Sequence, residues 1–284
     1  MRRLVVVGSV AGAPGVTTTA LAAAAAWPSD ADGGVRPVVV EADVSGGDLM
    51  IRFGLPATPS LLDVAAAAGQ PHSGSLLGAV NEIPFRTRVV AAVPGRGPCR
   101  EAVRLLAGGV GRQVLLGDSH DRGTVLLDVG RLTEDVEPLL AAADRLVLVS
   151  RGGAESLTHV SAGGFATEAG AGRVTLVVVG PCPYPAEEIV GTLGIPRLFF
   201  LPWDTKSVAA MNSPKPGALG TRRLRPSPLM SAARLLARQM AEPRKEIPTD
   251  LSRGGHGLED SEQLLTGGSR TAAVRVREVE ESET

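Results

Sequence analysis

Short, uninterrupted runs of valine and leucine recur along the chain, separated by segments that favour helices. Strands covered on both faces look like this, because neither face meets water and no polar alternation is needed. Strands that alternate with helices predict a doubly wound, mostly parallel α/β sheet. The predicted strands are 4–8, 37–42, 88–93, 124–128, 145–150, 173–180 and 197–201. The predicted helices between them are 15–26, 60–68, 99–107, 134–143, 155–169 and 186–193.

The pattern changes after the last predicted strand. We predict a helix at 204–212 and a final amphipathic helix at 227–242. From Pro243 onward Gly, Ser, Glu and Arg dominate, and such a composition cannot bury enough apolar surface to fold. We therefore expect one α/β domain over residues 1–242 and a disordered tail over residues 243–284.

Bulk composition excludes several classes of function. The net charge of −1 gives no general electrostatic reason to bind nucleic acid or a membrane. Cys99 and Cys182 stand far apart without ligand spacing, so they predict neither a zinc site nor a disulfide framework. No apolar run reaches the roughly 20 residues of a membrane span, and no signal peptide is recognised. We expect a cytoplasmic protein.

One segment departs from this neutral balance. Between Thr205 and Ala241 there are seven basic residues and no acidic residue. A basic amphipathic helix can lie on an anionic membrane, so peripheral membrane contact is one reading. Docking of the apolar face on the domain's own core is the second, and DNA binding is the third. The basic residues are Lys206, Lys215, Arg222, Arg223, Arg225, Arg234 and Arg238.

The segment 9–19 joins the first predicted strand to the first predicted helix and reads Ser-Val-Ala-Gly-Ala-Pro-Gly-Val-Thr-Thr-Thr. A glycine-rich turn at the start of a helix directs backbone N–H groups and the helix dipole at one spot, which binds phosphate. In the usual pattern, G-x-x-x-x-G-K-[ST], lysine reaches the outer phosphates and the hydroxyl holds magnesium. Gly15 and Thr17 match this pattern, but Val10 and Val16 replace the first glycine and the lysine. The loop thus predicts phosphate binding and is poorly equipped for phosphate chemistry.

Acidic residues follow two of the predicted strands. Glu41 and Asp43 end the second strand at positions i and i+2, which places both side chains on one face where they could position magnesium or a water. Asp128 closes the apolar run Val125-Leu126-Leu127, as the magnesium-binding acid of a Walker-B strand does. After the last strand comes Pro202-Trp203-Asp204, where a loop commonly wraps an adenine ring.

In this order the motifs resemble those of the MinD/ParA group of deviant Walker-A P-loop ATPases. The family's loop, G-K-G-G-x-G-K-[ST]-[ST], aligns with residues 10–18, and its D-x-D aligns with Glu41-Ala42-Asp43. The resemblance covers residues 1–242. It identifies a degenerate, lysine-lacking member, similar in kind to the TadZ/CpaE-type pilus-assembly localisation factors.

The resemblance implies roles for individual residues and two cofactors, ATP and Mg²⁺. Thr17, Asp43 and Asp128 would hold magnesium, and Asp43 would also orient the attacking water. Pro202 and Asp204 would flank the base. The phosphate contacts would come from Gly12, Ala13, Pro14, Gly15, Val16, Thr17 and Thr18.

Two family lysines are missing. The lysine that reaches the partner's phosphates across a dimer corresponds to Ala11, and the ordinary Walker lysine corresponds to Val16. A charge-assisted contact contributes about 1.5–3 kcal/mol to binding, and an arginine finger contributes about 10³–10⁵ in rate. We therefore expect weak binding and very slow or no hydrolysis, unless Arg131 or Arg151, which follow strands at the correct edge, supplies the charge. Arg2 and Arg3 precede the first strand and would lie at the opposite edge.

These observations favour an ATP-binding regulatory or positioning protein that forms a homodimer and meets a protein partner in a localised or membrane-associated assembly. One alternative is a nucleotide-independent scaffold for a membrane-associated assembly or secretion apparatus. Another is an active P-loop ATPase in chromosome partitioning or division-site placement that uses a substitute arginine.

Overall fold

The computed structural model describes residues 1–12, 15–68, 76–165, 172–213 and 227–242. The predicted tail, residues 243–284, lies outside the described residues. The same holds for Ala13 and Pro14 of the predicted phosphate loop and for four members of the basic run.

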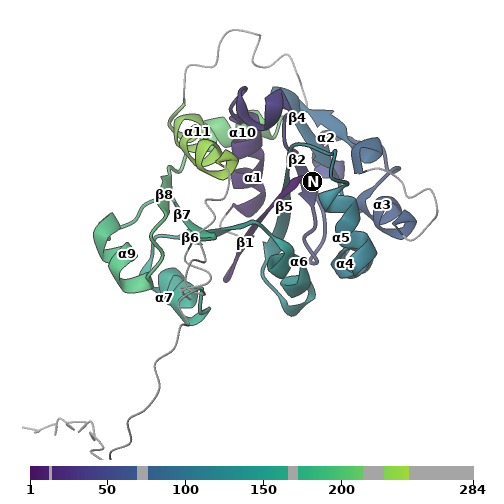
Figure 1. Ribbon diagram of the computed structural model, residues 1–284. Coiled ribbons are helices and arrows are strands. Elements are labelled where there is room, and N and C mark those ends of the chain that lie inside the picture. The colour runs from purple at the N-terminus through teal and green to yellow at the C-terminus, as the bar shows by residue number, and fades with distance from the viewer. Residues whose placement is uncertain (13–14, 69–75, 166–171, 214–226, 243–284) are drawn as a thin grey trace, which may run out of the picture. The chain divides into compact units, whose positions relative to one another are not determined.

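The described chain is built around one eight-stranded sheet (Figure 1). The strand order is β3-β4-β2-β5-β1-β6-β7-β8, and all neighbours are parallel except the pair β3 and β4. The predicted doubly wound, mostly parallel sheet is thus confirmed. The strands are β1 (Arg3–Ser9), β2 (Val38–Glu41), β3 (Asn81–Ile83), β4 (Thr87–Val90), β5 (Thr124–Arg131), β6 (Arg145–Arg151), β7 (Val174–Val179) and β8 (Leu198–Leu201).

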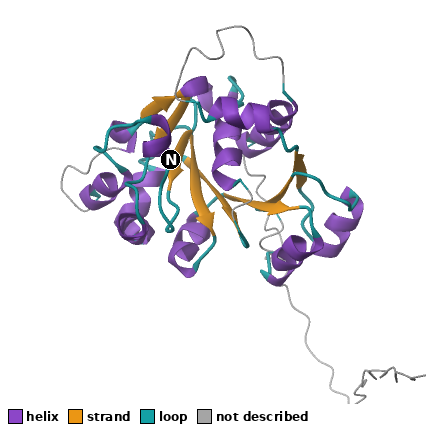
Figure 2. Ribbon diagram, turned by 180° about the vertical axis from the view of Figure 1, so that it is seen from behind, coloured by secondary structure: helices purple, strands orange, loops and turns teal. Residues whose placement is uncertain are grey.

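Helices cover both faces of this sheet (Figures 1 and 2). Alternate residues of β1 supply the two cores: Leu4 and Val6 face one, and Val5 and Val7 face the other. The helices on the first face are α3 (Leu61–Ala67), α4 (Arg96–Ala107), α5 (Gly109–Leu116), α6 (Glu137–Ala142), α7 (Ala154–Ala162) and α9 (Ala186–Leu193). Those on the second are α1 (Val16–Ala25), α2 (Leu49–Phe53), α10 (Thr205–Met211) and α11 (Pro228–Ala241).

The position of the last helix, α11, shows what its apolar face packs against. Leu229, Ala233, Leu236 and Met240 are buried in the second core, while Arg234 and Arg238 are exposed. The apolar face therefore docks on the domain itself. No helix among the described residues is long and apolar enough to cross a membrane.

Three elements were not predicted from the sequence. Strand β3 is three residues long and lies antiparallel at the edge of the sheet. Helix α2 has only five residues, and α5 follows α4 with a single glycine, Gly108, between them. Strand β3 and helix α2 are too short for a hydrophobic period to emerge from the sequence.

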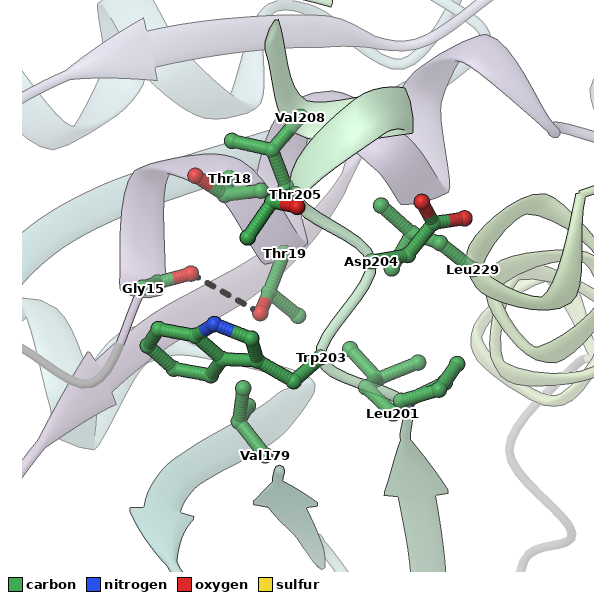
Figure 3. A pocket seen from close by; sticks show the side chains of 11 residues that line it. Gly15, Thr18, Thr19, Val179, Leu201, Trp203, Asp204, Thr205, Val208 and Leu229 are labelled. Atoms are coloured by element: carbon green, nitrogen blue, oxygen red, sulfur yellow. Dashed lines mark hydrogen bonds between the residues drawn. The ribbon is translucent and has the colours of Figure 1, made fainter. Parts of the chain in front are cut away.

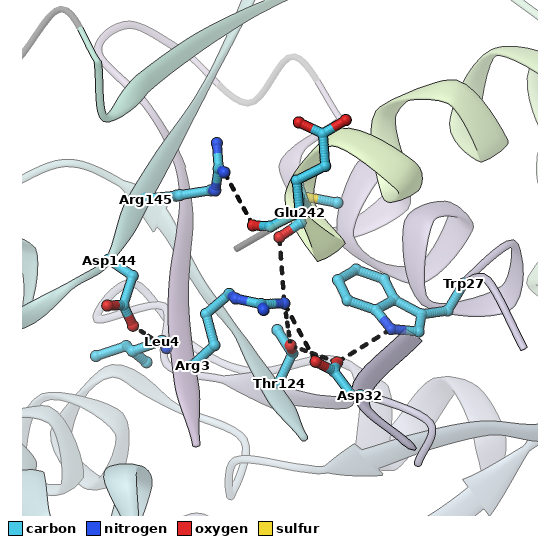
Figure 4. A network of polar contacts seen from close by, with 9 residues as sticks. Arg3, Leu4, Trp27, Asp32, Thr124, Asp144, Arg145 and Glu242 are labelled. Atoms are coloured by element: carbon cyan, nitrogen blue, oxygen red, sulfur yellow. Dashed lines mark hydrogen bonds and ion pairs between the residues drawn. The ribbon is translucent and has the colours of Figure 1, made fainter. Parts of the chain in front are cut away.

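The amino-terminal edge of the sheet carries a polar network (Figure 4). The Arg3 guanidinium contacts the Asp32 carboxylate at 3.2 Å and the Thr124 hydroxyl at 3.2 Å. The Arg145 guanidinium donates to the carbonyl of Glu242 at 3.0 Å, just beyond the end of α11. Arg2 is paired with Asp121 at 2.7 Å. Arg2 and Arg3 therefore both form ion pairs at the amino-terminal edge of the sheet, where the sequence places them.

Candidate functional site

Two described glycines between β1 and α1 adopt backbone conformations that favour glycine. Gly12 has φ +68°, and Gly15, which caps α1, has φ +93°. The Ser9 hydroxyl lies 3.0 Å from the Gly12 carbonyl oxygen and 3.3 Å from that of Gly130. Since Ser9 is fully buried, it ties the turn to the end of the neighbouring strand β5. The first amide groups of α1 thus begin at the carboxyl edge of the sheet, where an anion would meet them.

Val16, at the position of the Walker lysine, is the first residue of α1 and is 4% exposed. Its side chain belongs to the second hydrophobic core. Ala11 is half-buried and has no charge. The described part of the loop therefore presents backbone and the half-buried Thr17 and Thr18, but no cation, to a phosphate.

Asp128 on β5 is the most perturbed acid at this edge. Its side chain is fully buried; Oδ1 accepts a hydrogen bond from the Gly130 amide at 3.1 Å, while Oδ2 has no hydrogen-bond partner among the residues that the structure describes. Burial raises the pKa of the Asp128 carboxyl to about 7, and the Thr17 hydroxyl and the Gly130 amide oppose that rise. An unsatisfied carboxylate oxygen beside a threonine hydroxyl is a donor set that suits Mg²⁺.

Asp43, just after β2, lies close to this pair. Its Oδ1 accepts from the Ser45 amide at 2.8 Å and from the Ser45 hydroxyl at 2.6 Å. Its Oδ2 fills the space next to the Cα of Gly130. The negative charges of Glu41 and, to a smaller extent, Asp43 also contribute to the raised pKa of Asp128. The structure thus brings Thr17, Asp43 and Asp128 together.

Glu41 does not join them, which corrects the idea of a carboxylate pair serving one ligand. Its Oε1 accepts from the amides of Asp48 at 2.8 Å and Leu49 at 3.0 Å, and its Oε2 accepts from the amide of Ala92 at 3.0 Å. Burial raises the pKa of Glu41, against these three bonds. The carboxylate holds the loop after Asp43 to the start of α2 and to the end of β4, so its role is structural.

No cluster of three or more His, Cys, Asp or Glu side chains with metal-binding geometry occurs in the part of the chain that the structure describes. A magnesium site of the nucleotide-binding kind does not need one, because Mg²⁺ is then held by one or two carboxylates together with water and phosphate oxygens. Two carboxylates and one hydroxyl fit that requirement.

A second part of the site is a pocket of about 260 Å³ beside the start of α1 (Figure 3). It lies between Gly15, Thr18 and Thr19 on one side and the connection from β8 to α10 on the other. Its apolar lining comes from Val179, Leu201, Pro202, Val208 and Leu229, together with the Trp203 ring.

Pro202 and Asp204, predicted to flank a base, both line this pocket. The Asp204 carboxylate caps α10: Oδ1 accepts from the Ser207 amide at 3.0 Å and Oδ2 from the Ser207 hydroxyl at 2.6 Å. These bonds hold the pKa of Asp204 below its ordinary value. Trp203, for which the sequence predicts no role of its own, forms a wall of the pocket.

The two arginines proposed to replace the lysines occupy different places at this edge. The Arg151 guanidinium carbon lies 5.3 Å from the centre of the Trp203 ring, next to the pocket. Arg131 ends β5 opposite Ser9 and is exposed, and its guanidinium forms no hydrogen bond or ion pair with the residues that the structure describes.

Comparison with models of protein families and with curated proteins finds no match to the sequence. Solved structures do match in shape. The cell division ATPase MinD of Pyrococcus furiosus has a TM-score of 0.63 and 19% identity, over 84% of this chain and 98% of that one. A ParA family ATPase from Chlorobium tepidum gives 0.62 and 17%, over 83% and 97%.

The chain has a MinD/ParA-like fold. A third similar structure is the septum site-determining protein MinD of Pyrococcus horikoshii in complex with Mg-ADP, with a TM-score of 0.62, 18% identity and coverage of 84% and 96%. In this MinD/ParA-like fold the strand ends that carry Ser9, Asp43, Asp128 and Arg151 meet at the carboxyl edge of one parallel sheet, where ligands of such sheets bind.

Proposed function

We propose that this chain binds Mg-ATP at the carboxyl edge of its sheet and acts as a regulatory or positioning protein that hydrolyses ATP very slowly or not at all. One observation carries the proposal. Gly15 begins α1 near an Asp128 oxygen that has no partner within the described part of the chain, whereas Val16, in the lysine position, is buried in the core. The site can hold phosphate and magnesium, but it lacks the cations that transfer phosphate.

The assignment of roles follows the geometry. Thr17 and Asp128 would hold the magnesium, with Asp43 beside them or turned toward an attacking water. Gly12, Gly15, Val16, Thr17 and Thr18 would contact phosphate through backbone or hydroxyl groups, together with Ala13 and Pro14, which lie outside the described residues. Pro202 and Asp204 would border the base. The Mg-ADP complex of the Pyrococcus horikoshii MinD supports nucleotide and magnesium as the ligands.

The expected output is a change in contacts rather than a chemical product. The likeness in fold to a cell division ATPase and a septum site-determining protein supports a role in placing an assembly within the cell. We infer that nucleotide binding favours a homodimer and contact with a protein partner in a localised or membrane-associated assembly. A cytoplasmic protein with peripheral contact to a membrane would satisfy this role.

Calorimetric titration of the purified chain with Mg-ATP, followed by a long phosphate-release assay on the same sample, tests the proposal. We expect binding that requires Mg²⁺, and release of phosphate at or near the background rate. Absence of binding at millimolar Mg-ATP would overturn the proposal and leave the nucleotide-independent scaffold. DNA binding by the basic run is excluded if a gel-shift signal persists in arginine-to-alanine variants.

A second candidate, an active ATPase, is favoured by the position of Arg131. This exposed guanidinium has no partner among the described residues and ends β5 three residues after Asp128. If phosphate release is measurable, Arg131→Ala should abolish it, whereas Arg122→Ala, an exposed arginine that precedes β5, should not. Equal rates in both variants would exclude Arg131 as the substitute cation.

A further inference from the structure

The ends of three neighbouring strands lie together next to the pocket beside α1, and the last of them leads to Trp203, which lines it. Arg151 ends β6, Gly180 follows β7, and Trp203 follows β8. Gly180 has φ +86°, and a Cβ placed there would come within 3.3 Å of the Trp203 ring. Because the middle strand end has no side chain, Arg151 can reach across it to the indole.

The Trp203 ring is held in place yet remains available to a ligand. Its side chain is 58% exposed, the Arg151 guanidinium packs over it, and Figure 3 shows it extending from the β8–α10 connection toward Gly15. Val179 borders the pocket below the ring, and the start of α1 borders it on the opposite side. Aromatic rings of this kind bind any nucleobase by stacking, since every base has a π face.

The polar side chains of the pocket are poorly suited to tell one purine from another. Each oxygen of Asp204 already accepts a hydrogen bond from Ser207, which leaves it fewer acceptor sites for a base, and Pro202 has no N–H to donate. The Gly180 amide already donates to the Leu201 carbonyl at 2.9 Å, and the Thr19 hydroxyl donates to the Gly15 carbonyl at 2.9 Å.

Thr18 and Thr205 are the remaining hydroxyls of the lining. A hydroxyl rotates and serves as donor or acceptor, so it accommodates the amino group of adenine and the carbonyl of guanine alike. Sites that discriminate by about 10⁴–10⁵ do so by leaving fixed buried polar groups unpaired in the wrong complex. The fixed polar side chains of this pocket, Thr19 and Asp204, already have partners within the protein, so neither purine would leave them unpaired.

We propose that the pocket accepts purine nucleoside triphosphates as a class, stacking the base on Trp203, and that it distinguishes ATP from GTP only weakly. Arg151 acts as a positioning residue that holds the indole, and it does not contact phosphate. This inference rests on the proposed function, since it assumes that the phosphates bind at the loop after β1.

Calorimetric titration of the whole chain with Mg-ATP, Mg-GTP and Mg-tripolyphosphate tests the inference. We expect dissociation constants for ATP and GTP that agree within about threefold, and a constant for tripolyphosphate at least about tenfold weaker, because it lacks a base to stack. If one purine nucleotide binds tenfold or more tightly than the other, the inference fails while the proposed function stands. If none of the three ligands binds, both fail.

Variants of Trp203 test whether the indole ring supplies the affinity for the base. Trp203→Leu should weaken ATP and GTP binding by about tenfold and leave tripolyphosphate binding unchanged, and Trp203→Phe should retain most of the affinity. Phe200→Leu is a matched control, because Phe200 is an exposed aromatic residue on β8 that does not line the pocket. If Trp203→Leu strengthens ATP binding, the indole occupies the space of the base and the inference is wrong.

Arg151→Met separates positioning from phosphate contact, since methionine keeps an apolar stem over the ring and removes the charge. We expect ATP binding to weaken by about two- to fivefold, in line with the loss of a cation–π contact, and tripolyphosphate binding to stay unchanged. An equal loss for both ligands would show that Arg151 binds phosphate, which would overturn its assignment as a positioning residue.

Discussion

The carboxylate of Asp43 lies directly against the backbone of Gly130, in the space that a side chain at position 130 would occupy. Gly130 has φ +59°, and its amide donates to Oδ1 of Asp128. One glycine on β5 therefore sets the positions of both carboxylates that we assign to magnesium. It does so through its missing Cβ on one side and its N–H group on the other.

Replacement of Gly130 by alanine should disturb this arrangement. The left-handed backbone adds strain of about 1–2 kcal/mol for a residue with a Cβ, and the collision with Asp43 should add a further ~1–3 kcal/mol to the loss in free energy of unfolding. Because Asp43 must move, we also expect Mg²⁺-dependent ATP binding to weaken by at least tenfold. Denaturant unfolding and calorimetry measure the two effects.

Gly33→Ala is the matched control, since Gly33 has φ +68° and no atom would lie within 4 Å of its added Cβ. It should show the strain alone and bind Mg-ATP as the parent does. If the two variants lose equal stability and equal affinity, the contact between Asp43 and Gly130 contributes neither to folding stability nor to Mg-ATP binding.

The sequence predicts the order of strands and helices well because the buried strands are continuous apolar runs of strand length, too short for typical buried helices. It places Asp43 and Asp128 at one sheet edge for the same reason, since the carboxyl ends of parallel strands meet there. The strand pattern alone could not separate Glu41 from Asp43, and only the resemblance to a family singled out Asp43. Both are carboxylates after a strand, and only the positions of three backbone amides decide that Glu41 is structural.

The contributions of Gly130 and Trp203 were also beyond the sequence. A glycine after an acid has many uses, and only the close approach of Asp43 explains this one. The pairing of Arg151 with Trp203 depends on strand order, because β6 and β8 are separated by β7. A signal was present in Gly180, which leaves the strand end between them without a side chain.

Glu41→Gln should loosen the loop that follows Asp43. An amide side chain can place its oxygen toward Asp48 and Leu49 or toward Ala92, but not toward both, and its NH₂ group then meets a backbone donor. Leaving a buried donor unsatisfied costs about 1–3 kcal/mol, which should appear as a lower free energy of unfolding. Hydrogen exchange at the amides of Asp48 and Leu49 should become faster.

The control for this variant is Glu82→Gln, an exposed glutamate on β3, which should change neither quantity. If Glu41→Gln leaves stability and amide exchange at the parent's values, the three hydrogen bonds do not hold the loop.

The stability of the nucleotide-free protein should depend on the ionisation of Asp128. Its carboxyl ionises near 3.8 in the unfolded chain and at about 7 when folded, so between these values the unfolded state binds fewer protons. The free energy of unfolding should therefore fall as pH rises from about 4 to about 7, by a total on the order of 4 kcal/mol. Urea unfolding without Mg²⁺ across this range measures the slope.

Asp128→Asn should remove that part of the slope, because the amide does not titrate. Asp30→Asn, at an exposed position, should leave the slope as it is in the parent. A slope that persists in Asp128→Asn must come from other groups, and the assignment to Asp128 would then be wrong.

Val16→Lys restores the Walker lysine to the loop. The aliphatic stem can follow the apolar path of Val16 while the ammonium group reaches the phosphate site at the head of α1. Loss of the buried valine should lower the free energy of unfolding by about 1–3 kcal/mol. A new charge-assisted contact contributes about 1.5–3 kcal/mol, so Mg-ATP binding should tighten by about tenfold or more.

Val16→Met separates charge from shape, because methionine has an unbranched stem of similar length and no charge. It should lose stability to a similar or smaller extent and leave Mg-ATP affinity unchanged. Equal tightening in both variants would mean that the valine had merely obstructed the loop. A folded Val16→Lys protein that binds Mg-ATP no better than the parent would show that phosphate does not sit at the start of α1, and the proposed site would be lost with it.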